Sequence, residues 1–160
     1  GTVPKEICTH CRGTTVVRDA KDLELNVPAG IDDGQTIRLH GEGEAGAHGG
    51  TAGDLYVTVR VRSDPRFRRE GVDVRSDVTV TFSQAALGAT VETPTLDGNA
   101  SVKIPPGTQS GRTLRLKGKG AARLHGHGRG DHLLTVTVKT PERITKKQRE
   151  LFQKLGEEGE

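Results

Sequence analysis

Two stretches of the chain that resemble each other decide the fold. Residues 26–43 read NVPAGIDDGQTIRLHGEG, and residues 103–120 read KIPPGTQSGRTLRLKGKG, which is the same pattern 77 positions later. The correspondence continues without a gap, and 16 of the 40 residues in 23–62 are identical to their counterparts in 100–139. Half of these identities are Pro, Gly or Asp, which are residues typical of turns. Because turns and spacing are preserved together, the chain is predicted to contain one structural unit twice.

Apolar and polar residues alternate along much of the chain with the two-residue period of a strand that buries one face. The alternating stretches are 23–27, 36–40, 55–62, 72–82, 102–104, 114–116 and 134–138. The Asp97-Gly98 pair predicts a two-residue hairpin turn between Val91 and Val102. These patterns predict a mainly β fold.

Two short helices are expected beside the strands. Ser83 is predicted to cap a helical turn over residues 84–87. Near the C-terminus, Thr145 and Gln148 have the spacing of a capping box, and the helix that they begin is expected to end at Gly156.

The composition excludes several classes of function. The net charge is 24 − 21 = +3 with neutral histidine, and the chain has three Phe, one Tyr and no Trp. A nucleic-acid partner would require a basic stripe or a set of stacking aromatic residues, and the sequence has neither. No apolar run approaches the roughly 20 residues that cross a bilayer, and no signal peptide is seen, so no membrane partner is expected. Two closely spaced cysteines are not a secreted disulfide framework, which makes the cytoplasm the expected compartment.

One glycine-rich stretch matches a nucleotide-binding motif by letter only. Residues 41–46 read GEGEAG, but residues 47–53 cannot open the helix that a dinucleotide site requires, and the second copy lacks the third glycine. The stretch is therefore interpreted as a glycine-rich strand connection. Asp54 and Asp131, each between a glycine and a strand, are interpreted as turn residues.

Two groups of metal-ligand residues are candidates for a site. Cys8 and Cys11 form a C-x-x-C motif, which is half of a zinc knuckle, and no second pair exists. Two free thiols and a metal half-site completed by other sequence both stay open. In the second glycine-rich loop, a cluster could bind metal, although solvated side chains are the favoured interpretation. Its members are His125, His127, His132 and Asp131.

Several motifs occur together in an order typical of one family. They are Cys8–Gly13, the two Pro-x-Gly…Gly…Arg-x-Leu…Gly-x-Gly units, AGDLYV at 52–57, AALG at 85–88 and PTLDG at 94–98. From about Ile7 to the final helix, the chain resembles the C-terminal substrate-binding region of DnaJ-type co-chaperones of the bacterial zinc-containing class. The resemblance implies two tandem β-sandwich-like domains of one repeated unit, with a short helical turn in the second and a C-terminal helix. It implies a non-enzymatic chaperone of protein folding in the stress response. Such a protein holds unfolded client polypeptide and delivers it to a DnaK-type chaperone.

The resemblance also implies a domain organisation. Residues 1–16 would be the remnant of a zinc-binding module, 17–70 the first substrate-binding β domain, 71–142 the second β domain, and 143–160 the helix and tail. In the family, the opening strand of the first domain precedes the zinc module. The first domain is therefore expected to be incomplete and to leave a strand edge that a neighbouring molecule can fill. No His-Pro-Asp loop of a J-domain occurs, so the DnaK-type partner is expected to be contacted mainly through other regions.

The family's client site predicts four residues in this chain. A shallow apolar pocket in the first domain is lined by the strand before the Pro-x-Gly turn and by the strand after Gly-Asp. Here those strands carry Leu23 and Leu25, and Leu55 and Val57. A client would add as a strand and place one side chain in the pocket. For each residue, an ordinary position in the core is the alternative.

Two further expectations follow from the resemblance. The Cys8–Cys11 motif looks like the fourth of four zinc-module motifs, but Thr15 stands where a glycine is usual. Full-length family members use zinc as a cofactor, and without the partner cysteines no well-formed zinc site is expected in this chain. In the final helix, Leu151, Phe152 and Leu155 either pack on the second domain or form a homodimer. Packing within the chain is favoured because the helix is only about ten residues long.

Two other functions compete with client binding. A structural β-sandwich scaffold would hold no peptide, and a thiol oxidoreductase would use Cys8 and Cys11. An exposed apolar groove in the first copy but not in the second would favour client binding over the scaffold.

Overall fold

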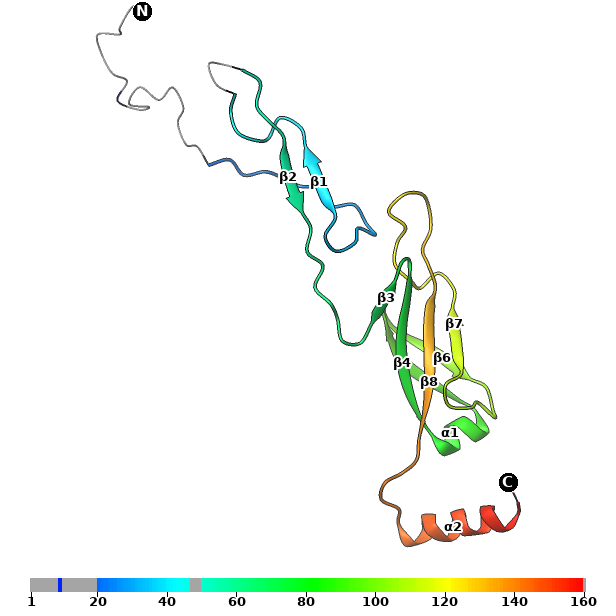
Figure 1. Ribbon diagram of the computed structural model, residues 1–160. Coiled ribbons are helices and arrows are strands. Elements are labelled where there is room, and N and C mark those ends of the chain that lie inside the picture. Colours follow the sequence, from blue (N-terminus) through cyan, green and yellow to red (C-terminus); the bar gives the residue numbers. More distant parts are fainter. Residues whose placement is uncertain (1–8, 10–19, 47–49, 160) are drawn as a thin grey trace, which may run out of the picture. The chain divides into compact units, whose positions relative to one another are not determined.

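The computed structural model describes residues 9, 20–46 and 50–159, which divide into two compact units (Figure 1). Unit 1 is Gly1–Arg62 and unit 2 is Ser63–Glu160. Within the described residues, the structure has eight strands in three sheets and two helices. This confirms the mainly β fold that the alternating sequence predicts.

Unit 1 contains one antiparallel hairpin, formed by β1 (Thr36–Leu39) and β2 (Leu55–Thr58). The register pairs Ile37 with Val57, and the apolar side chains of both strands share one face because side chains alternate along a strand. All of these apolar side chains are half-buried: Ile37, Leu39, Leu55 and Val57. Both strands were predicted, although β2 ends before the alternating pattern does.

Unit 2 is built from two sheets. The larger sheet has the order β3 (Arg68–Glu70), β4 (Asp73–Thr81), β8 (His132–Lys139) and β7 (Thr113–Leu116). The strands β4 and β8 are parallel, and the other neighbours are antiparallel. The smaller sheet is the hairpin of β5 (Ala89–Thr95) and β6 (Gly98–Ile104). This hairpin was predicted, and its two loop residues are Leu96 and Asp97, one position earlier than the Asp97-Gly98 pair suggested.

The core of unit 2 lies between its two sheets. Both sheets and the first helix contribute buried apolar side chains to one cluster: Val78, Val80, Ala85, Val102, Ile104, Leu134 and Val136. Of these, Ile104, Leu134 and Val136 have no exposed surface. Burying a Val, Leu or Ile side chain contributes about 1.5–3 kcal/mol, so this layer of aliphatic residues stabilises unit 2.

The helices begin with capping boxes. The helix α1 (Phe82–Leu87) is capped by Thr81, not by Ser83 as predicted, because Thr81 is the residue with extended backbone, and its Oγ1 accepts from the Gln84 N–H at 3.2 Å. The helix α2 (Lys146–Glu157) has the predicted box, in which the Thr145 N–H also donates to the Gln148 Oε1 at 2.8 Å. It continues past Gly156, which is therefore not its end.

The repeat is present in three dimensions, with the same register 77 residues apart. The pair Ile37–Val57 in unit 1 corresponds to Leu114–Leu134 in unit 2. The connection before β2 is also repeated, because the Gly43 N–H donates to the Gly53 oxygen at 2.8 Å, as the Gly120 N–H does to the Gly130 oxygen.

The aspartates after Gly53 and Gly130 act as turn residues in both copies. The Asp54 Oδ1 accepts from the Gly41 N–H at 3.0 Å, and the Asp131 Oδ1 accepts from the Gly118 N–H at 2.8 Å. The Gly-x-Gly stretch serves close packing of the chain. A Cβ on Gly43 would lie only 2.7 Å from the main-chain carbonyl oxygen of Asp54.

The two copies differ in the strand that precedes the Pro-x-Gly turn. Residues 102–104 lie in β6, which exists because it pairs with β5. The corresponding residues 23–27 form no strand, so the prediction of a strand there is wrong. A strand requires ladder partners, and the counterparts of β5, residues 12–18, lie outside the described part of the chain. Likewise β8 pairs with β4, whereas β2 has no partner other than β1 among the described residues.

Candidate functional site

The hairpin of unit 1 presents an apolar face that remains partly exposed. Leu55 and Val57 point to this face from β2, opposite the apolar residues of β1. In unit 2, the counterpart of Val57 is Leu134, which is fully buried under the second sheet. None of the described residues of unit 1 is fully buried. The same strand pair is thus covered in unit 2 and partly open in unit 1.

The remaining two predicted pocket residues lie on another segment. Leu23 is 37% exposed and Leu25 is half-buried, and both belong to the stretch without strand structure. The structure therefore brings Leu55 and Val57 together on one face, while a joint pocket with Leu23 and Leu25 stays a prediction.

The opposite face of the hairpin carries an aromatic residue that the sequence reasoning did not select. Tyr56 is 62% exposed, and the Arg38 guanidinium lies 5.9 Å from the centre of its ring. Arg38 also donates to the Asp54 Oδ2 at 2.7 Å. The Gly41 N–H and then the Arg38 guanidinium hold the pKa of Asp54 below its usual value. The sequence signal that could have identified Tyr56 is a large aromatic side chain at a position where the alternating strand otherwise has polar residues.

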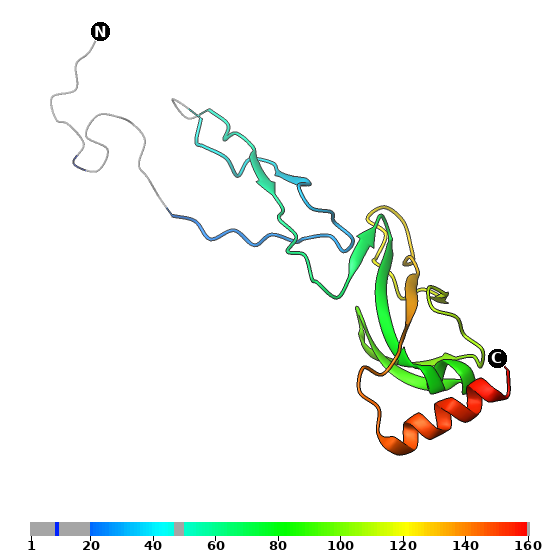
Figure 2. The same ribbon diagram turned by 60° about the horizontal axis from the view of Figure 1, so that its bottom comes forward.

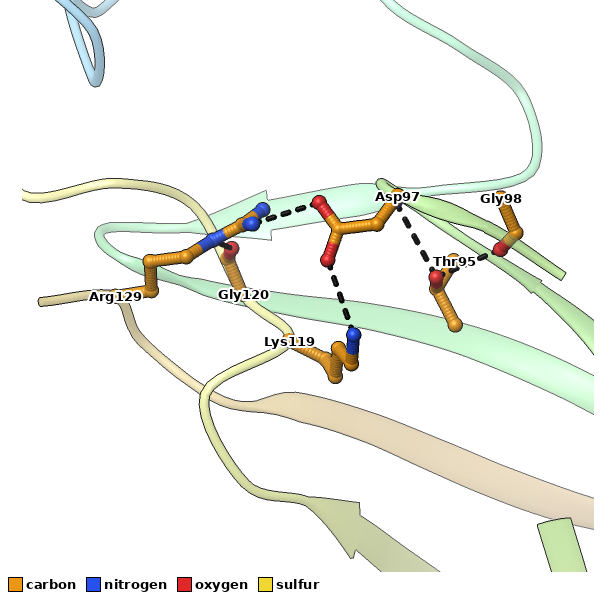
Figure 3. A network of polar contacts seen from close by, with 6 residues as sticks. All are labelled: Thr95, Asp97, Gly98, Lys119, Gly120 and Arg129. Atoms are coloured by element: carbon orange, nitrogen blue, oxygen red, sulfur yellow. Dashed lines mark hydrogen bonds and ion pairs between the residues drawn. The ribbon is translucent and has the colours of Figure 1, made fainter. Parts of the chain in front are cut away.

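In unit 2, an ionic cluster fixes the tip of the β5–β6 hairpin to the second glycine-rich loop (Figure 3). Arg129 donates to the Asp97 Oδ1 at 2.6 Å, and Lys119 donates to the Asp97 Oδ2 at 3.3 Å. Hydrogen bonds from these two cations lower the pKa of Asp97, and Arg129 has the larger effect. Unit 1 has a comparable pair of reversed polarity, Lys21 with Glu42, at 2.8 Å. In both units an ion pair therefore supports the glycine-rich loop, a structural role.

The candidate metal residues do not form a site within the described part of the chain. Cys8 and Cys11 lie outside it, and no cluster of three metal-ligand side chains occurs among the residues that are described. The loop histidines do not converge, because His125 and His127 are exposed whereas His132 is buried in β8.

An apolar hollow lies in unit 2. It has a volume of about 670 Å³ between α1, the end of β4 and α2. Leu151, Phe152 and Leu155 line it, and the Phe152 ring meets the Phe82 ring edge-to-face at 6.0 Å. Figure 2 shows α2 beside α1. An exposed apolar groove in the first copy but not in the second was expected if the chain binds clients. Unit 2 also has an apolar groove, so this expectation does not separate client binding from a scaffold.

These features define the class of the protein: a mainly β chain with a duplicated strand unit and an open apolar hairpin face. No described helix is both long and apolar enough to cross a membrane. The family model of the DnaJ C terminal domain matches residues 4–141. The chain belongs to this family, which confirms the resemblance to the C-terminal region of bacterial DnaJ-type co-chaperones.

Individual relatives support the same assignment. The chain is 45% identical over 157 residues to the chaperone protein DnaJ of Fusobacterium nucleatum subsp. polymorphum, which covers 98% of this chain and 40% of the relative. It is 50% identical over 152 residues to the chaperone protein DnaJ of Bacillus cytotoxicus, which covers 95% of this chain and 42% of the relative. The chain thus spans about two fifths of the length of these relatives. The family is not enzymatic, which removes the thiol oxidoreductase as a candidate function.

Proposed function

We propose that this chain is the client-holding part of a DnaJ-type co-chaperone and binds unfolded or extended polypeptide. The observation that carries this proposal is the partly exposed apolar face of the β1–β2 hairpin, whose counterpart in unit 2 is covered. The client backbone adds to an edge of the hairpin as a further strand. One apolar client side chain is held by Leu55 and Val57 together with Leu23 and Leu25.

The two parts of this interaction have different selectivity. Ladder hydrogen bonds involve only the backbone, so they accept any client sequence without proline at the donor positions. Burying one apolar side chain adds about 1.5–3 kcal/mol, which selects for an apolar residue without selecting a particular one. A weak and promiscuous site results, as the holding of many unfolded clients requires.

The DnaK-type chaperone, and the zinc ion that the family uses, belong to the same proposal. We infer that transfer to a DnaK-type chaperone in the cytoplasm uses regions of the protein beyond this chain. Cys8 and Cys11 are proposed as half of a zinc site in the full-length protein, with no complete site formed by this chain. A second function, the structural scaffold, is favoured by the well-packed core of unit 2 and by the apolar groove in that unit.

Peptide binding distinguishes the client-holding module from the scaffold. A fluorescein-labelled extended peptide with one central Leu is titrated with the whole chain, and the anisotropy is measured. A saturable rise in anisotropy is expected. The affinity should fall at least tenfold when alternate residues of the peptide are replaced by proline, because the peptide then loses backbone N–H donors to the ladder. A scaffold would give no saturable change with either peptide.

We further propose that α2 packs within the chain through Phe152. Phe152→Ala is expected to destabilise the docked state of α2 by about 1–2 kcal/mol, less than full core truncation because the side chain is 38% exposed. The loss is measured from the thermal melting of the ellipticity at 222 nm. Gln153→Ala, on the other side of the helix, is the control and should melt as the parent does.

Sedimentation of the same two variants separates packing from dimerisation. Packing within the chain predicts one sedimentation coefficient at all concentrations. A concentration-dependent homodimer that Phe152→Ala abolishes would instead assign the groove of α1 and α2 to a second copy of the chain.

A further inference from the structure

His132 is a polar residue at a position where the repeat places an apolar one. It has no exposed surface, and its counterpart 77 residues earlier is Leu55. Its Nε2 lies 2.7 Å from the Ser76 Oγ across the parallel β4–β8 pair. Its Nδ1 is buried without a hydrogen-bond partner among the described residues. A leucine has no ring nitrogen to leave unsatisfied, and an unsatisfied buried polar atom costs about 1–3 kcal/mol. A leucine would, however, remove the histidine partner of the Ser76 Oγ.

The surroundings of His132 disfavour a charged ring. A protonated imidazole donates from both nitrogens, and the buried Nδ1 has no acceptor here. On β4, the neighbouring Arg75 is exposed and donates to Glu70 at 2.7 Å, so this ion pair lies away from the ring. On β7, the strand residue opposite His132 is Leu116.

The remaining charged groups of the adjacent elements have other partners or are exposed. Asp73, the half-buried carboxylate at the start of β4, accepts from the Asp131 N–H at 2.7 Å. On β7 and just after it, Arg115 and Lys117 are exposed, and on β4, Asp77 is exposed as well. The three residues of β3 are also exposed, and Arg66 pairs with Asp64. Asp131 accepts from the Gly118 N–H and lies 3.6 Å from Arg115. Burial without a compensating carboxylate lowers the pKa of His132.

The ring of His132 supports the segment through which the chain enters unit 2, called here the leading segment (residues 63–70). The Phe67 ring meets the His132 ring edge-to-face, with 5.9 Å between centroids and 70° between planes. Beyond Phe67, the segment is held by the three-residue strand β3 and its exposed ion pair Arg75–Glu70. An exposed pair of this kind contributes little, so the β3–β4 ladder and the contact between the Phe67 and His132 rings are left to hold the segment.

We propose that His132 is an acid-sensitive latch for the leading segment. When His132 takes up a proton, its ring leaves the buried site, the Phe67 contact is lost, and β3 separates from β4. The leading segment then loses its attachment to β4 and becomes more mobile. This inference is independent of client binding, because it concerns only contacts within unit 2.

The direction of the effect follows from proton linkage. In the open state, His132 has the ordinary pKa of about 6.5, whereas burial lowers its pKa in the closed state. The stabilisation that the neutral, buried ring gives to the closed state is therefore fully present above pH 6.5. Below that value the opening constant is expected to rise by up to about tenfold per pH unit, until the lowered pKa is reached.

Hydrogen exchange of the leading segment tests the latch. The whole chain is labelled between pH 7.5 and 5.0, and rates in residues 63–70 are corrected for the intrinsic pH dependence of exchange. The opening constant of the parent protein should rise as the pH falls below 6.5. His132→Leu, which introduces the residue found at the repeated position, should show no rise, and His125→Leu, in the exposed loop, should behave as the parent. A parent without the rise, or His132→Leu with the same rise, would overturn the proposal.

An NMR titration of the parent protein keeps the test decisive if His132→Leu fails to fold. The His132 ring nitrogens and the contact between the Phe67 and His132 rings are followed together. The latch predicts that both change at one midpoint below pH 6.5. Protonation of His132 with the Phe67 contact intact would contradict it.

Discussion

Val57→Asp is expected to weaken client-peptide binding by at least tenfold. The proposed site buries one apolar client side chain against Leu55 and Val57, and that burial is worth about 1.5–3 kcal/mol, or roughly ten- to a hundredfold in affinity. A carboxylate in this position would have to lose its water without gaining a partner, which adds to the loss. The affinity is measured by anisotropy with the labelled peptide.

The hairpin supplies its own control for this charge. Thr58 is the next residue of β2 and is exposed on the other face. Thr58→Asp therefore adds the same charge to the same strand, and binding within about threefold of the parent is expected. Val57→Thr, which keeps the branched shape, should bind several-fold more weakly while the hairpin stays formed. Equal affinities for Val57→Asp and the parent protein would remove Val57 from the site.

The same experiment on the preceding segment tests the shared pocket. Leu23→Asp is expected to weaken binding as Val57→Asp does, whereas Asn26→Asp should not. If Leu23→Asp binds as the parent does, the pocket consists of the hairpin face alone.

Leu134→Ala is expected to lower the free energy of unfolding of unit 2 by about 3 kcal/mol. The side chain is fully buried between the sheets, and truncation of buried leucines to alanine costs about 2–5 kcal/mol because a cavity remains. Leu55→Ala makes the same leucine-to-alanine change on the hairpin face of unit 1, and truncating this half-buried side chain should cost about 1 kcal/mol or less.

The chain allows the two units to be followed separately in urea. Tyr56 is the single tyrosine and there is no tryptophan, so tyrosine fluorescence reports unit 1. Both described helices belong to unit 2, so the ellipticity at 222 nm reports mainly that unit. Leu134→Ala should shift only the ellipticity transition. Equal costs for Leu134→Ala and Leu55→Ala would mean that the hairpin face is as well covered as the core of unit 2.

The repeated unit was predictable because its signals are local. The register of β1 with β2 and of β7 with β8 follows from turn residues and alternating side chains that the sequence carries explicitly. The capping box at Thr145 and Gln148 is local in the same way. The cap of α1 was misplaced because Thr81 and Ser83 are both good capping residues, and the end of β4 decides between them.

The features that were missed depend on distant partners. Residues 23–27 alternate as a strand does, but a strand forms only where another strand supplies hydrogen bonds, and none is present among the described residues. The strand β3 has no alternating pattern, and its pairing with β4 creates it. His132 was assigned to a loop cluster because the sequence does not show that β4 runs beside it and buries it.

Amide hydrogen exchange, followed by NMR with and without saturating extended peptide, tests most directly whether unit 1 holds a client by strand addition. We expect slower exchange along an edge of the β1–β2 hairpin, with the free edge of β7 in unit 2 unchanged. Protection confined to unit 2, or no added protection anywhere in the hairpin at saturation, would contradict client binding by unit 1.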